Sequence, residues 1–212
     1  GNNPTLAHLI AKRNFLPEAA RFEQLDDLVW AFGSMGTQDK AKHLATMYLE
    51  DLSDLIKETV DEHFGFSRYA EKLGRSANSF DELYNLLQKE YTYVDELMIG
   101  ILKQRMAALE PALVALSVPF PGNLYASFRC AQWIKLNYPA TKIAMGGGFP
   151  NTELRSLSDP RVFEFYDFIT LDDGEAPVEQ LVAFVAGKIP VTALKRCFIL
   201  QDGQVSFINN KS

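Results

Sequence analysis

The chain has 212 residues, of which 47% are hydrophobic and 23% are charged, and its formal net charge is −6. These values are typical of a globular domain that buries a core without disulfide or metal, and the lack of a basic stripe argues against a nucleic-acid partner. No apolar run reaches the roughly 18 to 20 residues that cross a bilayer, so we expect a cytoplasmic protein with no membrane partner.

Cys130 and Cys197 are the only cysteines. Two cysteines so far apart in a chain of this class are expected to be free thiols. Neither belongs to a CxxC or CxxxCxxC cluster, so the sequence predicts no iron–sulfur or structural zinc site built by this chain alone.

Residues 1–110 are expected to be helical and to pack on a sheet formed later in the chain. Apolar residues recur there at three- and four-residue spacing, and Thr37 is expected to cap the longest helix. The segment Ser79-Phe80-Asp81-Glu82 fits a capping box at the start of another helix. The apolar stripes could also form a groove for a partner, although we expect them instead to cover the sheet and each other.

From residue 112 the pattern changes to apolar runs that alternate with helical segments. Strands are predicted at residues 112–118, 141–145 and 167–171, and helices near residues 123–137 and 177–186. Short helical turns are expected at 152–166, with Asp159-Pro160 starting one. Asp202-Gly203 between two apolar runs is typical of a β-hairpin. The fold class is therefore α/β: a partial flavodoxin/Rossmann-like parallel sheet of about three strands at 111–190, followed by a hairpin and linker at 191–212.

Three loops follow the predicted parallel strands, and ligands bind open parallel sheets in the crevice outside the carboxyl ends of their strands. We therefore expect one shared rim. The candidate binding residues on these loops are Ser117, Pro119, Asn123, Gly146, Gly147, Gly148, Asp173, Gly174 and Glu175. No catalytic or metal-ligating residue is expected among them.

Each loop also has a purely structural explanation. The three glycines permit close backbone approach, which suits either a ligand or a tight turn. Ser117 is not in a GxSxG elbow, so its hydroxyl is not expected to be a nucleophile. The acidic loop at 172–175 can cap the helix that follows it, or Asp172 or Asp173 could accept a phosphoryl group as in receiver domains.

The three loops together resemble a known family. The sequences LSVPFPGN, GGGFPNTELRSL and VFEFYDFITLDDGEAP, at these separations, are similar to the cobalamin-binding-like N-terminal domain of radical S-adenosylmethionine (SAM) enzymes. The resemblance covers about residues 110–187. Ser117 matches the family's serine, Gly146-Gly147 match its glycine pair, and Gly174-Glu175 match its Gly-Glu loop.

The resemblance implies an accessory domain that holds a cofactor or substrate beside a catalytic barrel following residue 212, which is its expected partner. It also implies that one edge of the sheet lacks strands that lie upstream. The chain departs from the family's DxHxxG signature, since His63 in Asp61-Glu62-His63-Phe64-Gly65 has its glycine one residue early. Cobalamin would therefore bind without a histidine from this chain.

The [4Fe-4S] cluster and S-adenosylmethionine would be bound only by the barrel, so the chain itself is expected not to be catalytic. The alternative is a non-enzymatic interaction domain that binds a partner through its helical half, with the sheet as scaffold. The residue pattern predicts neither substrate nor oligomeric state.

Overall fold

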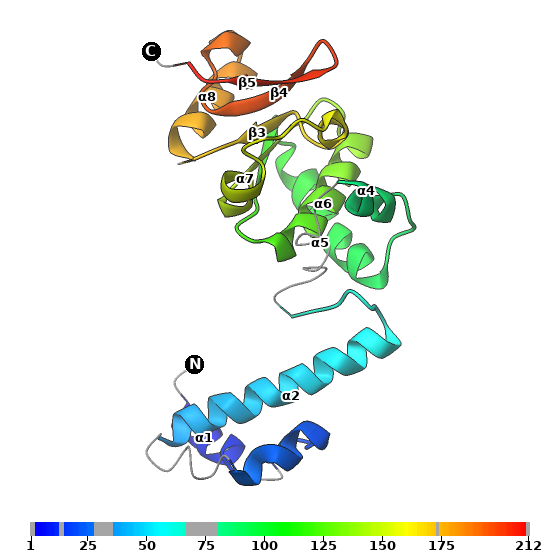
Figure 1. Cartoon of the computed structure of the whole chain (residues 1–212), viewed down its shortest axis with the longest axis vertical. Helices are drawn as coiled ribbons and strands as arrows, with labels where there is room; N and C mark the ends of the chain where they lie inside the picture. The colour runs from blue at the N-terminus through cyan, green and yellow to red at the C-terminus, as the bar shows by residue number, and fades with distance from the viewer. Residues whose placement is uncertain (1–2, 13–14, 28–35, 67–79, 173, 211–212) are drawn as a thin grey trace. The chain divides into compact units, whose positions relative to one another are not determined.

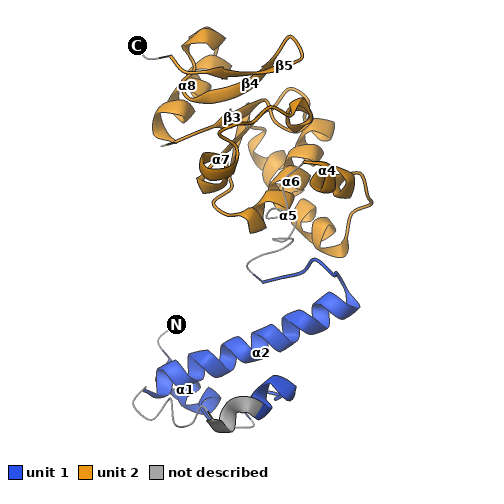
Figure 2. Cartoon of the chain, viewed as in Figure 1, with its two compact units in different colours: residues 1–66 blue, residues 67–212 orange. Residues whose placement is uncertain are grey.

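The computed structural model describes residues 3–12, 15–27, 36–66, 80–172 and 174–210. The chain forms two compact units, residues 1–66 and 67–212 (Figure 2). The sequence suggested a single helical region through residue 110, whereas the helices between residues 81 and 109 belong to the same unit as the sheet.

The first unit is helical. It contains α1 (Pro4–Ile10), the 3-10 helix η1 (Ala20–Asp27) and α2 (Thr37–Thr59). Asn3 caps α1 by accepting a hydrogen bond from the Leu6 amide at 3.0 Å, as the Asn-Pro pair indicated. The predicted cap at Thr37 is displaced by one residue, because Gly36 precedes the first turn of α2 and Thr37 lies within it.

The second unit has a five-stranded mixed sheet in the order β1-β2-β3-β4-β5 (Figure 1). Its strands are β1 (Leu113–Ser117), β2 (Lys142–Gly146), β3 (Phe168–Thr170), β4 (Cys197–Gln201) and β5 (Gln204–Ile208). Its helices are α4 (Asp81–Leu87), α5 (Tyr93–Leu109), α6 (Leu124–Asn137), α7 (Gly148–Glu153) and α8 (Glu175–Val185), with 3-10 turns η2 (Pro121–Asn123), η3 (Pro160–Glu164) and η4 (Val191–Ala193). Strands β1, β2 and β3 are parallel, and β4 and β5 continue the sheet antiparallel. The predicted α/β class is confirmed.

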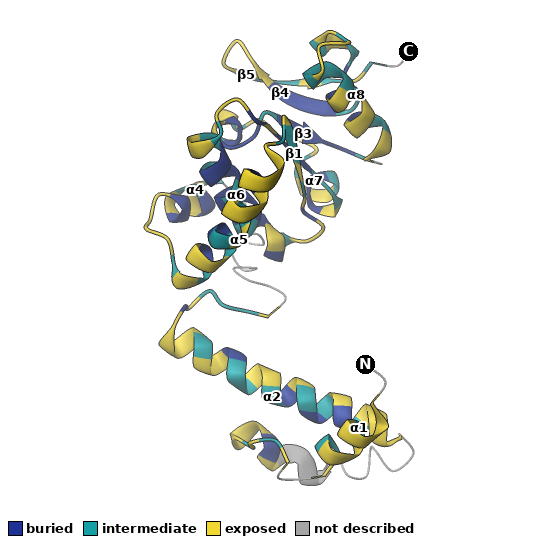
Figure 3. Ribbon diagram, turned by 180° about the vertical axis from the view of Figure 1, so that it is seen from behind, coloured by how far each residue is buried: buried dark blue, intermediate teal, exposed yellow. Residues whose placement is uncertain are grey.

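Two apolar clusters cover the two faces of the sheet. The larger one joins α4, α5, α6 and η3 to one face, and residues such as Ile99, Ile134 and Ile143 are almost fully buried in it. The smaller one joins α8 and η4 to the other face around Phe168 and Leu181. The buried strands between these helices are visible in Figure 3. Burial on both faces explains why the parallel strands are continuous apolar runs.

The hairpin at the end of the chain follows the prediction closely. Asp202 and Gly203 have φ values of 51° and 75°, and strands β4 and β5 pair from Gln201–Gln204 to Cys197–Ile208. Two positive φ values in a two-residue loop match the right-handed twist of the strands, which is why Asp-Gly is favoured there. The short turn at Asp159-Pro160 is also confirmed, since Asp159 accepts a hydrogen bond from the Arg161 amide at 3.0 Å.

Helix capping was predicted less well. Ser79 of the proposed capping box lies outside the described residues, and no side-chain hydrogen bond caps α4 at Phe80. A capping box does begin α5, where the Thr92 hydroxyl accepts from the Asp95 amide and the Asp95 carboxylate accepts from the Thr92 amide. Aspartate replaces the usual Glu or Gln at the third position, so the standard pattern did not single it out.

Asp167 joins β2, β3 and α6 at the start of β3. Its carboxylate accepts hydrogen bonds from the Ile143 amide at 2.8 Å, from Lys135 at 2.7 Å and from Lys142 at 3.1 Å. Burial by itself would raise the pKa of this carboxyl group, but the hydrogen bonds and the lysine charges together lower it.

Asp167→Asn is expected to lower the free energy of unfolding by about 2 kcal/mol at pH 7, because charge-assisted hydrogen bonds are lost. The pKa of Asp167 is lower in the folded protein than in the unfolded chain. The carboxylate therefore stabilises the fold fully above the unfolded pKa of about 3.9, and this stabilisation is lost as the pH falls through the folded-state pKa. Urea unfolding at several pH values should show the two proteins converging below about pH 4. Asp39→Asn on the exposed surface of α2 is the control, and an equal effect there would contradict the assignment.

Candidate functional site

The loops after the three parallel strands lie side by side at the carboxyl end of the sheet, which we call the rim (described residues 117–123, 146–155, 171–172 and 174–175). Ser117 at the end of β1 is in register with Gly146 at the end of β2. Thr170 at the end of β3 donates from its hydroxyl to the Met145 carbonyl oxygen at 3.1 Å. Parallel pairing therefore places the three loops together, as the sequence argument required.

The glycines of the rim are packed against the chain itself. Gly147 has a φ of +106°, and a Cβ there would lie 2.8 Å from the Val118 carbonyl oxygen. A Cβ on Gly148 would lie 2.7 Å from the Pro119 oxygen, and one on Gly146 would lie 2.7 Å from the Thr170 hydroxyl. Of the two explanations offered by the sequence, a ligand contact or a tight turn, the close backbone packing at Gly147 and Gly148 supports the turn, whereas the atom nearest Gly146 is the hydroxyl of Thr170 on β3.

Backbone hydrogen bonds join the loop after β1 to the loop after β2. The Val118 amide donates to the Gly146 oxygen at 2.7 Å, and the Phe149 amide donates to the Val118 oxygen at 2.9 Å. Val118 is fully buried, whereas the flanking Ser117 and Pro119 are exposed. The exposed flanks, rather than the glycines, present groups that a ligand can reach.

The structure describes three of the remaining candidates, and each lies at or just before the start of a helix that follows a parallel strand. Asn123 is exposed at the start of α6 without a side-chain capping bond, and Gly174 and Glu175 are exposed at the start of α8. No side-chain hydrogen bond caps α8 at Gly174. Asp173 lies outside the described residues, so its placement is not given.

The sequence argument overlooked two polar residues of the rim, Asn151 and Arg155. The Asn151 side chain accepts a hydrogen bond from the Asp172 backbone amide and donates one to the Asp172 backbone carbonyl oxygen. Arg155 forms an ion pair with the Asp172 carboxylate. These contacts hold Asp172 at a φ of 61°, which is unusual for a residue with a side chain. Asn151 lies in α7 and Arg155 follows its end by two residues, so no local signal in the sequence pointed to their shared partner.

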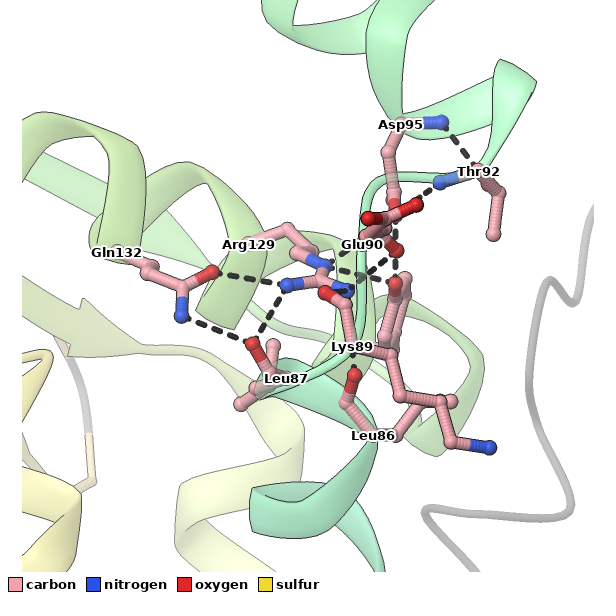
Figure 4. Close-up of polar contacts among 9 residues, drawn as sticks. Leu86, Leu87, Lys89, Glu90, Thr92, Asp95, Arg129 and Gln132 are labelled. Atoms are coloured by element: carbon pink, nitrogen blue, oxygen red, sulfur yellow. Dashed lines mark hydrogen bonds and ion pairs between the residues drawn. The ribbon is translucent and has the colours of Figure 1, made fainter.

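A second polar cluster lies at the C-terminal end of α4 (Figure 4). Asp95 and Arg129 are each 1% exposed and form an ion pair at 3.2 Å. The Tyr125 hydroxyl donates to Asp95 at 2.7 Å, and burial, together with this carboxylate, raises the pKa of the tyrosine. The pair therefore holds α5 and α6 together inside the core.

Arg129 also closes the end of α4. Its guanidinium donates to the carbonyl oxygens of Leu86, Leu87 and Lys89 at 3.1, 2.7 and 3.0 Å. The Leu86 oxygen also accepts from the Lys89 amide at 3.1 Å and the Leu87 oxygen from the Gln132 side chain at 3.0 Å, so the guanidinium adds to the bonding of carbonyls at the helix end. The adjoining cavity of about 580 Å³ is lined in part by Tyr84, Tyr91 and Gln132, but all three guanidinium nitrogens are already engaged within the protein, which indicates a structural role.

Other reactive groups lie away from the rim or are protected. Cys130 and Cys197 are free thiols, as predicted, and burial raises their pKa to about 11 and about 12. His63 follows the end of α2, where its amide donates to the Asp61 carboxylate at 2.9 Å in a local turn. The described ranges contain no group of three or more His, Cys, Asp or Glu residues that could hold a metal, and no helix in them is long and apolar enough to cross a membrane.

A scan against protein-family models, a search of curated proteins and a search of solved structures each found no match to this chain. The functional argument therefore depends on the residues of the rim and on the sequence resemblance.

Proposed function

We propose that residues 111–190 are an accessory, cobalamin-binding-like domain of a radical SAM enzyme, which holds a cofactor or substrate beside a catalytic barrel outside these 212 residues. One observation carries the proposal. The loops bearing Ser117, Gly146-Gly147 and Gly174-Glu175 adjoin one another on the rim, at the carboxyl ends of parallel strands. That is where open α/β sheets bind their ligands.

The fit to cobalamin differs between parts of the rim. The exposed Ser117, Asn123 and Glu175 offer hydroxyl, amide and carboxylate groups to a polar ligand. The three glycines offer a ligand less room, because the space that a side chain would occupy at each of them is filled by Val118, Pro119 or Thr170. All three histidines of the chain lie before residue 67, so the sheet-bearing unit offers no imidazole, and a corrinoid would have to bind without one from this unit.

Hydroxocobalamin added to the purified chain is expected to give a saturable change in its visible absorption. Ser117→Tyr should weaken this binding at least about tenfold, because a bulky ring would occupy the exposed end of β1. Ser158→Tyr is the matched control, since this exposed serine precedes η3 and β3 and is not one of the rim residues.

Two results of the titration would contradict the proposal. No spectral change with the parent chain would contradict cobalamin binding, and equal loss in both tyrosine variants would contradict binding at the rim. Cleavage of S-adenosylmethionine by the chain alone would contradict its accessory role, because the chain carries no CxxxCxxC cluster.

A non-enzymatic interaction domain is the second candidate, and one observation favours it. Helix α5 exposes large apolar side chains although its opposite side is already buried in the core. Exposed apolar patches often mark protein interfaces. This function would be supported by a partner-dependent loss of exposure on α5 in a chain that gives no cobalamin signal.

A further inference from the structure

Strand β1 has an open side. The Lys142 amide donates to the Ala112 oxygen at 2.9 Å and the Val118 amide donates to the Gly146 oxygen at 2.7 Å, so the even-numbered residues of this strand face β2. In a parallel ladder alternate residues point their N–H and C=O groups to opposite sides. Leu113, Ala115 and Ser117 therefore direct theirs away from β2, where the described part of the chain supplies no further strand.

This open edge lacks the usual protection. Proteins commonly guard an edge strand with a charged residue, a proline or a bulge. The five residues of β1, Leu-Val-Ala-Leu-Ser, include neither charge nor proline, and all five pair with β2 in unbroken register. Such an edge readily adds another strand through main-chain hydrogen bonds.

Helix α5, the element that directly precedes β1 in the sequence, exposes an apolar stripe. Tyr93, Leu97 and Ile101 recur every four residues and are 60%, 53% and 65% exposed, and Leu109 near the helix end is 72% exposed. The other side of α5 is buried through Ile99 and Met106 in the same core cluster that β1 joins. A helix with apolar residues on both sides is normally covered on both sides.

Gly100 lies near the middle of α5, beside Ile101, and is half-buried at the border of the stripe. Glycine in a helix interior costs about 1 kcal/mol relative to alanine. A Cβ at Gly100 would meet nothing within 4 Å among the described atoms, so packing inside the unit does not require a glycine there. Close approach of a second helix would require it, since the missing side chain lets two backbones come together.

The strand edge and the helix stripe suit a single two-fold axis. Only residues 110–112 join α5 to β1, and both elements contribute to one core cluster, which allows the helix to run back along the strand. A two-fold axis perpendicular to the sheet at Ala115, the middle of β1, would pair β1 with its copy antiparallel. The same axis would place α5 against its copy, also antiparallel, on the same face of the joined sheet.

The stripe is self-complementary under that operation. Tyr93 and Leu109 lie eight residues on either side of Ile101, so each would face the other across the axis. With the axis at Ile101, Arg105 would face Leu97, next to the exposed Glu96, so opposite charges would lie near each other at both ends of the pair. Closed two-fold interfaces are built from one patch that complements itself in this way.

We propose that β1 and α5 form the interface of a homodimer, in which two sheets join edge to edge and two α5 helices pack across the axis. The occupant of the open edge is thus a second copy of this chain. A stable interface buries roughly 800 Å² per partner, which one helix face does not provide, so both elements are needed.

Sedimentation equilibrium of the 212-residue chain from about 1 to 200 µM is expected to show reversible dimerisation. Ile101→Lys should weaken association at least about tenfold, because two like charges would meet at the axis. Val182→Lys on α8 is the matched control: this valine is 55% exposed, lies on the opposite face of the sheet and should leave association unchanged.

Two further variants separate the proposal from a folding defect. Ala115→Pro removes an outward N–H, which edge strands tolerate, so it should abolish pairing and leave the circular dichroism of the monomer unchanged. Gly100→Ala should raise the melting temperature of the monomer and yet weaken dimerisation several-fold. A chain that is monomeric at 200 µM, or a dimer that Ile101→Lys and Gly100→Ala do not weaken, would overturn the proposal.

Discussion

Arg129→Met is expected to lower the free energy of unfolding by about 3–5 kcal/mol, the largest effect of any single side-chain replacement considered for this protein. The substitution leaves Asp95 buried with its charge and with only part of its hydrogen bonding. It also leaves the carbonyls of Leu86 and Leu87 at the end of α4 without the guanidinium. Chemical denaturation followed by circular dichroism measures the loss.

Lys188→Met, on the exposed surface just after α8, is the control, and it should change the free energy of unfolding by less than about 0.5 kcal/mol. In a double-mutant cycle, Asp95→Asn combined with Arg129→Met should cost less than the sum of the two single changes, because each single change already breaks the same ion pair. Additive losses, or a loss below about 1 kcal/mol for Arg129→Met, would show that this cluster does not hold α4 in place.

Gly147→Ala is expected to destabilise the protein by about 2–4 kcal/mol, because two costs combine. The φ of +106° is strained for any residue with a side chain, and the new Cβ would press on the Val118 backbone at 2.8 Å. A backbone atom cannot turn aside as a flexible side chain can. Thermal unfolding of the variant beside the parent chain measures the loss.

Gly174→Ala is the matched control on the same rim, since its φ is −66° and a Cβ there would meet nothing within 4 Å. It should change the free energy of unfolding by less than about 1 kcal/mol. Equal stability of the Gly147 and Gly174 variants would contradict the packing explanation. The comparison also explains why a bulky residue at Gly147 is a poor test of ligand binding, because it would disturb the loop before any ligand is added.

Much of the fold could be predicted from local patterns. The apolar runs after residue 112 marked the three parallel strands, and Asp202-Gly203 marked the hairpin, because both signals lie within a few adjacent residues. The grouping of the candidate site followed from one rule, that parallel strands bring their carboxyl ends to the same edge. Ser117 and Gly146 are neighbours for that reason.

Contacts between distant residues were beyond this reasoning. Asp95 and Arg129 are separated by 34 residues, and nothing near either of them indicates its partner. The pairing of Asp172 with Asn151 and Arg155 likewise depends on how α7 packs against the end of β3. The division of the chain at residue 66 was also not visible, since helices on both sides of it show similar apolar spacing.

The amino-acid sequence by itself indicated the three parallel strands, the helices α6 and α8, the hairpin and the meeting of three loops at one rim, because periodicity, turn residues and strand direction are local properties. It did not indicate α7, which begins at Gly148 where a loop was expected, or the pairing of the hairpin with β3. Only the tertiary structure decided what the glycines do: Gly147 and Gly148 admit the backbone of Val118 and Pro119. It also revealed the buried Asp95–Arg129 pair and the open edge of β1. These features arise from which surfaces come into contact, and that is settled by packing among segments far apart in the chain.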